Sequence, residues 1–110
     1  MLKKKIIKAI KVKKLVRDNV PEILEAEGKK IETHIAEDKE YEKLLHNKLQ
    51  EEVKEFLQGE KEEKFADILE VLETISDTHN FNRDNVRMIK ARKAREEGRY
   101  LQRIVLDKVK

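Results

Sequence analysis

The chain of 110 residues has no cysteine and no tryptophan, only three glycines and one proline, and 5% aromatic residues. The absence of cysteine excludes a disulfide framework and any metal site built from thiolates. Few turn-forming residues, combined with 45% charged and 38% hydrophobic residues, favour helices with heavily charged outer faces and argue against an all-β fold. We therefore expect an all-α protein.

Long hydrophobic runs are missing as well. No stretch approaches the roughly 20 apolar residues that a membrane span requires. The N-terminal sequence MLKKKIIKAI begins with basic residues, but lysine interrupts its apolar stretch and no small-residue cleavage site follows, so it is a poor signal peptide. We expect a cytoplasmic protein without a membrane segment, folded as one domain over residues 1–110.

Acidic residues are absent from the beginning of the chain. Residues 1–17 contain eight lysines or arginines and no acid, which leaves 18 basic against 23 acidic residues in the remainder. A basic N-terminal arm, residues 1–13, thus precedes an acidic body whose carboxylates could bind a cation. The arm has no aromatic residue for base stacking, so nucleic-acid binding through unspecific phosphate contacts is the weaker alternative.

Two long helices are predicted in the middle of the chain. Apolar residues at spacings of three and four predict a helix from about residue 38 to 57, ending at Gly59, and a second helix over residues 61–78. Because the link between them is short, the two helices should form an antiparallel hairpin. The apolar stripe of the first helix is formed by Leu45, Leu49, Val53 and Phe56, and that of the second by Phe65, Ile68, Leu69, Leu72 and Ile75.

Shorter elements surround the hairpin. A short helix should begin near Pro21, after a capping residue at Asp18 or Asn19, and end at Gly28, and a third long helix should run from a cap at Asn82 to Glu97. For the remaining segments we expect mostly extended structure. Residues 6–16 should form a short strand or an extended arm, with a frayed helix as the alternative. Residues 29–36 should form a brief extended segment, and residues 103–106 a strand or an extended tail.

These helices are too few to bury both sides of the hairpin in so short a chain. We therefore expect a four-helix-type bundle that is completed by oligomerisation.

Carboxylates lie close to both apolar stripes. At 100° per residue, Glu52 falls inside the stripe of the first helix and Glu55 on its border, whereas Glu51 faces away. On the second helix Asp67 borders the stripe, and Lys64 falls among the apolar residues. Glu63 and Glu70 fall beside Asp67 on its solvent side.

A carboxylate on an apolar face must be protonated, paired with a base or bound to a metal. Several facing carboxylates suit magnesium, which prefers hard oxygen ligands and often binds through a few carboxylates and the phosphates of its substrate. The alternative reading is that these residues only form salt bridges with lysines at the border of charge-rich helices, and spacing alone does not decide between the two.

Four stretches, in this order, resemble one family. They are KLVRDNVPEIL at 14–24, KLQEEVKEFL at 48–57, FADILEVLETI at 65–75 and RYLQRIVL at 99–106. The chain resembles MazG-like proteins, and more closely the phosphoribosyl-ATP pyrophosphohydrolase-like branch of the all-α nucleoside triphosphate pyrophosphohydrolase superfamily.

The resemblance implies a helical bundle that assembles as a homodimer or homotetramer and hydrolyses a nucleotide between its α and β phosphates, releasing a monophosphate and pyrophosphate. The family holds magnesium, with manganese as a substitute, through EXXE and EXXD motifs. Glu52 and Glu55 match the EXXE pair and Asp67 matches the aspartate of EXXD. Glu52 and Glu55 would thus be the catalytic carboxylates, with Glu55 orienting the attacking water.

The chain departs from the family pattern at a ligand position. Lys64 stands where the first glutamate of EXXD is expected, and Glu97 and Arg99 replace an arginine and a glycine of the C-terminal motif. Glu63 or Glu70, at helical spacing from Asp67, could supply a substitute carboxylate. Alternatively, Lys64 pairs with Glu52 or Asp67 and occupies the cation site itself, which predicts a weak or inactive relative that still binds a nucleotide.

Three basic residues are candidates for phosphate contacts. Lys93 is the first of them, followed by Lys90 and Arg17, because ammonium groups and guanidinium forks both suit phosphate oxygens. For each of them the alternative is a solvated surface position.

Overall fold

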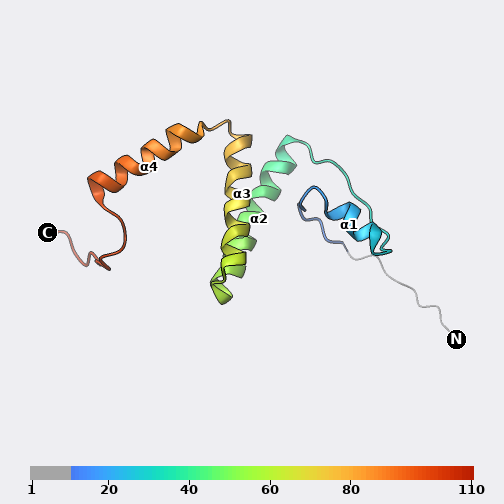
Figure 1. The fold of residues 1–110 in the computed structure, drawn as a ribbon, viewed down its shortest axis with the longest axis horizontal. Coiled ribbons are helices and arrows are strands. Elements are labelled where there is room, and N and C mark those ends of the chain that lie inside the picture. The colour runs from blue at the N-terminus through green and yellow to red at the C-terminus, as the bar shows by residue number, and fades with distance from the viewer. Residues whose placement is uncertain (1–10) are drawn as a thin grey trace. The chain divides into compact units, whose positions relative to one another are not determined.

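The computed structural model describes residues 11–110, and this range contains four helices and no strand (Figure 1). The all-α prediction is therefore confirmed for the described part of the chain. The first ten residues, which include most of the predicted basic arm and the beginning of the predicted segment 6–16, lie outside it. The helices are α1 (Val20–Ala26), α2 (Asp38–Gly59), α3 (Glu62–Thr78) and α4 (Arg83–Glu97).

The chain divides into two compact units, residues 1–71 and residues 72–110. The division falls inside α3, which is one continuous helix. Each unit is described separately below. The single domain and the four-helix-type bundle completed by oligomerisation both stay predictions.

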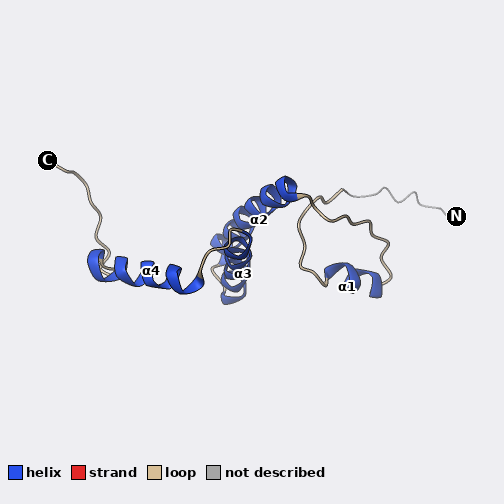
Figure 2. Ribbon diagram, turned by 90° about the horizontal axis from the view of Figure 1, so that it is seen from above, coloured by secondary structure: helices blue, strands red, loops and turns tan. Residues whose placement is uncertain are grey.

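A helical hairpin forms the centre of the first unit. The antiparallel α2 and the beginning of α3 lie side by side in both views (Figures 1 and 2), and the rings of Phe56 and Phe65 pack across them with centroids 5.8 Å apart. The only apolar side chains that are buried among the described residues are Leu45 of α2 and Val71 of α3. The hairpin thus has a thin apolar core, because most of the two predicted stripes is half-buried or exposed.

The turn of the hairpin lies one residue later than predicted. Helix α2 continues through Gly59, and Glu60 adopts the left-handed conformation with φ 51° and donates its backbone N–H to the carbonyl of Phe56. Left-handed backbone at a helix end is typical of glycine. Here the glutamate after the glycine takes that role.

Helix α1 begins close to its predicted position. Asn19 is the residue before the helix, but its side chain makes no capping hydrogen bond, and Pro21 occupies the first turn, where its missing N–H leaves no bond unmade. Gly28, with φ 84°, follows the end of the helix. On either side of α1, residues 11–17 and 29–37 form neither helix nor strand. The extended structure predicted for residues 29–36 stays a prediction.

The second unit consists of the end of α3, all of α4 and the C-terminal residues. Asn82 caps α4 as predicted: its side-chain oxygen accepts the backbone N–H of Asn85 at 2.9 Å. Gly98 ends the helix. Residues 103–106 form no strand, and Arg103 has a left-handed φ of 62°. The strand alternative is therefore wrong for this segment.

Within the described range, none of the helices combines the length and the apolar character that crossing a membrane would require.

Candidate metal site

Three carboxylates of α2 converge on one side of the helix. One oxygen of each of Glu51, Glu52 and Glu55 lies within 4.8 Å of an oxygen of the other two. The spacing explains two of the three pairs, because Glu52 and Glu51 stand three and four residues before Glu55 and such residues are neighbours on a helix surface. Glu51 and Glu52 are adjacent in the sequence and meet only through their long side chains. Among residues 11–110 no other group of three histidine or carboxylate side chains is this close.

Glu52 is the buried member of the three, which confirms the prediction that it falls inside the apolar stripe. Only 7% of the residue is exposed. Its Oε1 lies 3.7 Å from Nζ of Lys48, whereas its Oε2 is buried and has no hydrogen-bond partner. A buried charged oxygen without a partner costs at least about 1–3 kcal/mol, so this atom destabilises the metal-free protein.

The helical wheel placed Glu51 away from the apolar stripe of α2. In the structure its side chain is only partly exposed. Its carboxylate accepts hydrogen bonds from Lys48, at 2.9 Å, and forms an ion pair with Lys14, at 3.0 Å. The hydrogen bond from Lys48, followed by that from Lys14, lowers the pKa of Glu51 below its usual value. The wheel of α2 could not show this contact with Lys14, because Lys14 belongs to the segment before α1.

Lys64 connects the two helices of the hairpin. Its Nζ donates a hydrogen bond to Oε1 of Glu55 at 2.8 Å and lies 3.8 Å from Oδ2 of Asp67. The bond to Glu55 raises the pKa of Lys64, so the ammonium stays charged at neutral pH. The predicted pairing of Lys64 with Asp67 is confirmed at this longer distance, but its closer partner is Glu55 and not Glu52. Glu55 is the more exposed of the two glutamates, whereas Glu52 is turned into the interior.

Arg17 also contacts a predicted ligand. Its guanidinium donates to Oδ1 of Asp67 at 2.9 Å. A residue that we predicted to contact phosphate therefore neutralises a carboxylate of the candidate site. More than half of the Arg17 side chain is still exposed, so part of its guanidinium fork faces solvent.

Together these residues form a charge cluster with equal numbers of acids and bases. Each carboxylate has a cation within 4.0 Å, and each cation has a carboxylate. The formal charges cancel, so the net charge of the cluster does not favour a bound metal ion. The observation that favours one is the unpartnered Oε2 of Glu52. The acids of the charge cluster are Glu51, Glu52, Glu55 and Asp67, and the bases are Lys14, Arg17, Lys48 and Lys64.

Other predicted site residues are not part of the charge cluster. Glu63 and Glu70 are exposed on α3, and neither belongs to the group of three close carboxylates. Lys90 and Lys93 are exposed on α4, in the second unit. The roles predicted for these four residues stay predictions.

Sequence reasoning missed Lys14, Lys48 and Glu51. The contacts of Lys48 could have been predicted, since it stands three residues before Glu51 and four before Glu52, the spacing at which helical side chains meet. The contact of Lys14 could not, because it joins residues 37 positions apart through a segment without regular structure.

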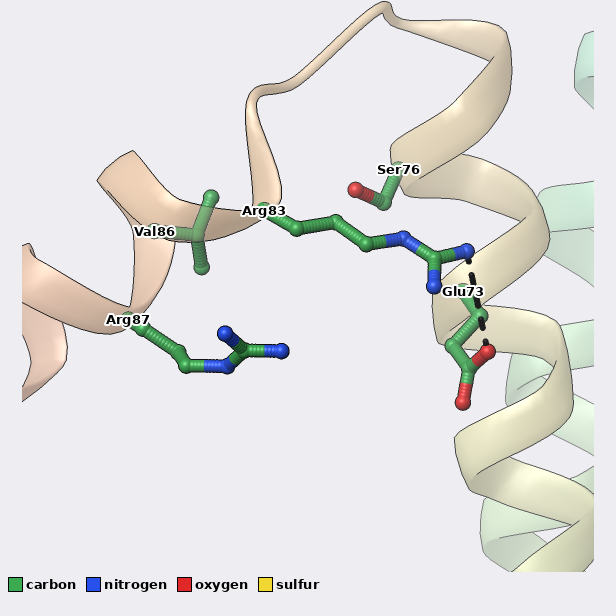
Figure 3. Close-up of a pocket in the computed structure, with 5 residues that line it drawn as sticks. All are labelled: Glu73, Ser76, Arg83, Val86 and Arg87. Carbon is green, nitrogen blue, oxygen red and sulfur yellow. Dashed lines mark ion pairs between the residues drawn. The ribbon is translucent and has the colours of Figure 1, made fainter.

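A second concave region lies within the second unit (Figure 3). Arg83 and Arg87 extend from the beginning of α4 toward Glu73 and Ser76 of α3, and Val86 completes the lining. Arg83 forms ion pairs with Glu73 at 3.9 Å and Asp77 at 3.4 Å, and Arg87 pairs with Asp84 at 3.1 Å. All of these side chains except Ser76 are exposed, and they show no convergence on a ligand position.

The donor set of the charge cluster fits a hard divalent cation. Its acids provide only carboxylate oxygens, which magnesium prefers, and one of those oxygens is buried without a partner. The ammonium of Lys64 lies between Glu55 and Asp67, 2.8 Å and 3.8 Å from their oxygens. The carboxylates present therefore suit a metal ion, with a lysine between two of them.

Comparisons with protein-family models, with curated proteins and with solved structures gave no match to this chain.

Proposed function

We propose that the protein is a metal-dependent nucleotide pyrophosphohydrolase, which hydrolyses a nucleoside triphosphate or a related nucleotide between its α and β phosphates. The observation that carries the proposal is the buried, unpartnered Oε2 of Glu52 within the EXXE sequence of α2. A buried carboxylate oxygen is costly to maintain, and a metal ligand is a function that justifies it. The sequence resemblance supports the same ion and the same reaction.

The carboxylates of the hairpin would hold the ion. Glu52 and Glu55 provide oxygens from α2 and Asp67 from α3, and magnesium, when bound, supplies an activated water and neutralises charge on the leaving pyrophosphate. Glu55, which is only half-buried, can accept a hydrogen bond from the attacking water and so orient it. The exposed part of the Arg17 guanidinium suits a phosphate oxygen next to Asp67.

A second copy of the chain is part of the proposal. In the first unit several large apolar side chains of the hairpin are exposed, whereas the only buried apolar ones among the described residues are Leu45 and Val71. A homodimer or homotetramer that pairs these faces would bury them and form a four-helix-type bundle. The exposed side chains include Val53, Leu57, Phe65 and Leu69.

A second candidate function is a catalytically weak or inactive relative that still binds a nucleotide. The 2.8 Å contact between Lys64 and Glu55 favours it, because an ammonium held by a ligand of the proposed site competes with the metal for that ligand. Replacing a bound ion by an internal cation keeps the carboxylates compensated without the metal.

The test is pyrophosphate release from a panel of canonical and modified nucleoside triphosphates, with magnesium, with manganese and with a chelator. We expect release that needs the metal and falls about 100-fold or more in Glu52→Gln, because ligand loss exceeds the usual effect of changes around a ligand. Glu73→Gln, an exposed carboxylate in an ion pair of the second unit, is the matched control and should keep its rate.

Two results would contradict the proposed pyrophosphohydrolase function. One is an absence of release from every nucleotide with either ion. The other is release that persists in Glu52→Gln at the rate of the Glu73→Gln control. If release is absent while nucleotide binding is measurable by equilibrium dialysis, the second candidate replaces the first.

A further inference from the structure

Glu51 lies closer to the proposed site than its sequence position suggested. Its carboxylate shares the 4.8 Å group with Glu52 and Glu55. Magnesium binds oxygen at about 2.1 Å in octahedral geometry, so neighbouring ligands of one ion lie about 3 Å apart and opposite ligands about 4 Å apart. Rotation of the long glutamate side chains has to close this difference, and Glu55 is the surface neighbour of both Glu51 and Glu52 on α2.

An independent observation points to a ligand at the same place. Glu52 has a side chain that is 9% exposed and an Oε2 without any partner. The cations of the charge cluster bind Glu51, Glu55 and Asp67 at 3.0 Å or less, and none of them satisfies this oxygen. A divalent ion between Glu52 and its two neighbours would do so.

We infer that Glu51 supplies the carboxylate ligand that Lys64 removes, so that a divalent cation binds to one face of α2 through Glu51, Glu52 and Glu55. The inference rests on the proposed function, since it completes the metal site of that proposal. It replaces Glu63 and Glu70 in the role of substitute ligand, because both are exposed and stand outside the group of three carboxylates.

The binding of the ion competes with the lysines on Glu51. Lys14 and Lys48 both hold its carboxylate, and a metal can take it only as they withdraw. Lys14 is the easier to displace, since its side chain is 54% exposed and it belongs to a segment without regular structure. Lys14 is therefore a competitor of the metal, and its removal should strengthen metal binding.

The test measures Mn²⁺ binding to the purified full chain without nucleotide, using the electron paramagnetic resonance signal of the free ion. We expect Glu51→Gln to weaken binding about tenfold or more, and Lys14→Ala to strengthen it. Glu63→Gln and Glu70→Gln, which remove the same charge from α3, should change the affinity by no more than about twofold. Helical circular dichroism in chelator verifies that each variant is folded.

Three results would overturn the inference. They are the absence of Mn²⁺ binding by the unaltered protein, an affinity unchanged in Glu51→Gln, and an equal loss in Glu63→Gln or Glu70→Gln. The proposed function fails separately. If Mn²⁺ binds through Glu51 but no pyrophosphate is released, the proposed enzymatic function is contradicted and the role of Glu51 as a ligand is supported. If metal-dependent release survives in Glu51→Gln and the Mn²⁺ affinity is unchanged, the enzymatic function is supported and the role of Glu51 is contradicted.

Discussion

The charge cluster of the first unit and the ion pairs around Arg83 and Arg87 in the second are built from the same residue types, yet they differ in burial. Carboxylate side chains in the charge cluster are 9–36% exposed, and their ion pairs span 2.8–3.8 Å. In the second unit the corresponding side chains are 60–85% exposed and the ion pairs span 3.1–3.9 Å. Solvent therefore compensates every charge in the second region.

The comparison shows what separates a candidate site from a charged surface. An exposed ion pair contributes about 0–1 kcal/mol, and its atoms have water as an alternative partner. In the charge cluster, Oε2 of Glu52 is buried and has no hydrogen-bond partner in the protein. The number of acidic residues does not distinguish the two regions, whereas one buried oxygen does.

Three changes test this comparison, and Lys64→Glu should have the largest effect of the three. It would make the charge cluster a stronger metal site and so increase its difference from the ion pairs of the second unit. This change removes a cation from the charge cluster and adds a carboxylate between Glu55 and Asp67, so under the proposed function Mn²⁺ should bind about tenfold or more tightly. Pyrophosphate release should rise with it. The same titration and assay on Lys61→Glu, an exposed lysine just before α3, control for the change in net charge.

An unchanged or lower affinity in Lys64→Glu would contradict the idea that Lys64 blocks the site. It would instead indicate that the contact with Glu55 orders the ligands, and that loss of this order outweighs the added carboxylate.

A smaller effect is expected on stability from Glu52→Leu. Leucine has a similar volume and leaves no buried oxygen without a partner, so the metal-free protein should gain about 1–2 kcal/mol in free energy of unfolding. Urea denaturation in chelator measures this. The matched Glu73→Leu in the second unit should stay within about 0.5 kcal/mol of the unaltered protein. If Glu52→Leu destabilises the protein, the contact of Glu52 with Lys48 outweighs the unpartnered oxygen.

The smallest effect concerns acid pH and Glu51. Hydrogen bonds from Lys48 and Lys14 lower the pKa of Glu51 below 4.5, so the folded state is the better acid. The resulting stabilisation is fully present above this pH and is lost as the pH falls through the lowered pKa. Urea denaturation between about pH 5 and 3 should therefore show a shallower loss of stability in Glu51→Gln than in the unaltered protein. Parallel curves would contradict the contribution of these hydrogen bonds.

Much of the fold was predictable because its signals are local. The apolar spacing of Leu45, Leu49 and Phe56 indicated α2, and Asn82 and Gly98 marked the ends of α4. The exact turn of the hairpin was not predictable, since the residue that becomes left-handed is Glu60 and glycine stands one position earlier. Assembly with a second copy was predicted from the shortage of helices to cover the hairpin, and it stays a prediction.

The site was predictable only in part, and for the same reason. The wheel of α2 placed Glu52 among apolar residues because burial on a helix follows its period. It could not show that Lys14 and Arg17, from the segment before α1, reach Glu51 and Asp67, since these contacts join residues 37 and 50 positions apart. Lys64 was recognised as unusual, but its choice of Glu55 over Glu52 depends on how the two helices face each other.

The contact between Lys64 and Glu55 also has an evolutionary consequence. A lysine codon becomes a glutamate codon by a single base change, so one mutation separates Lys64 from the carboxylate that the proposed function would use at this position. In the present state the ammonium supplies to Glu55 a positive charge within the chain itself. The negative charge of Glu55 is thus compensated within the chain, whatever the concentration of divalent cations in its surroundings.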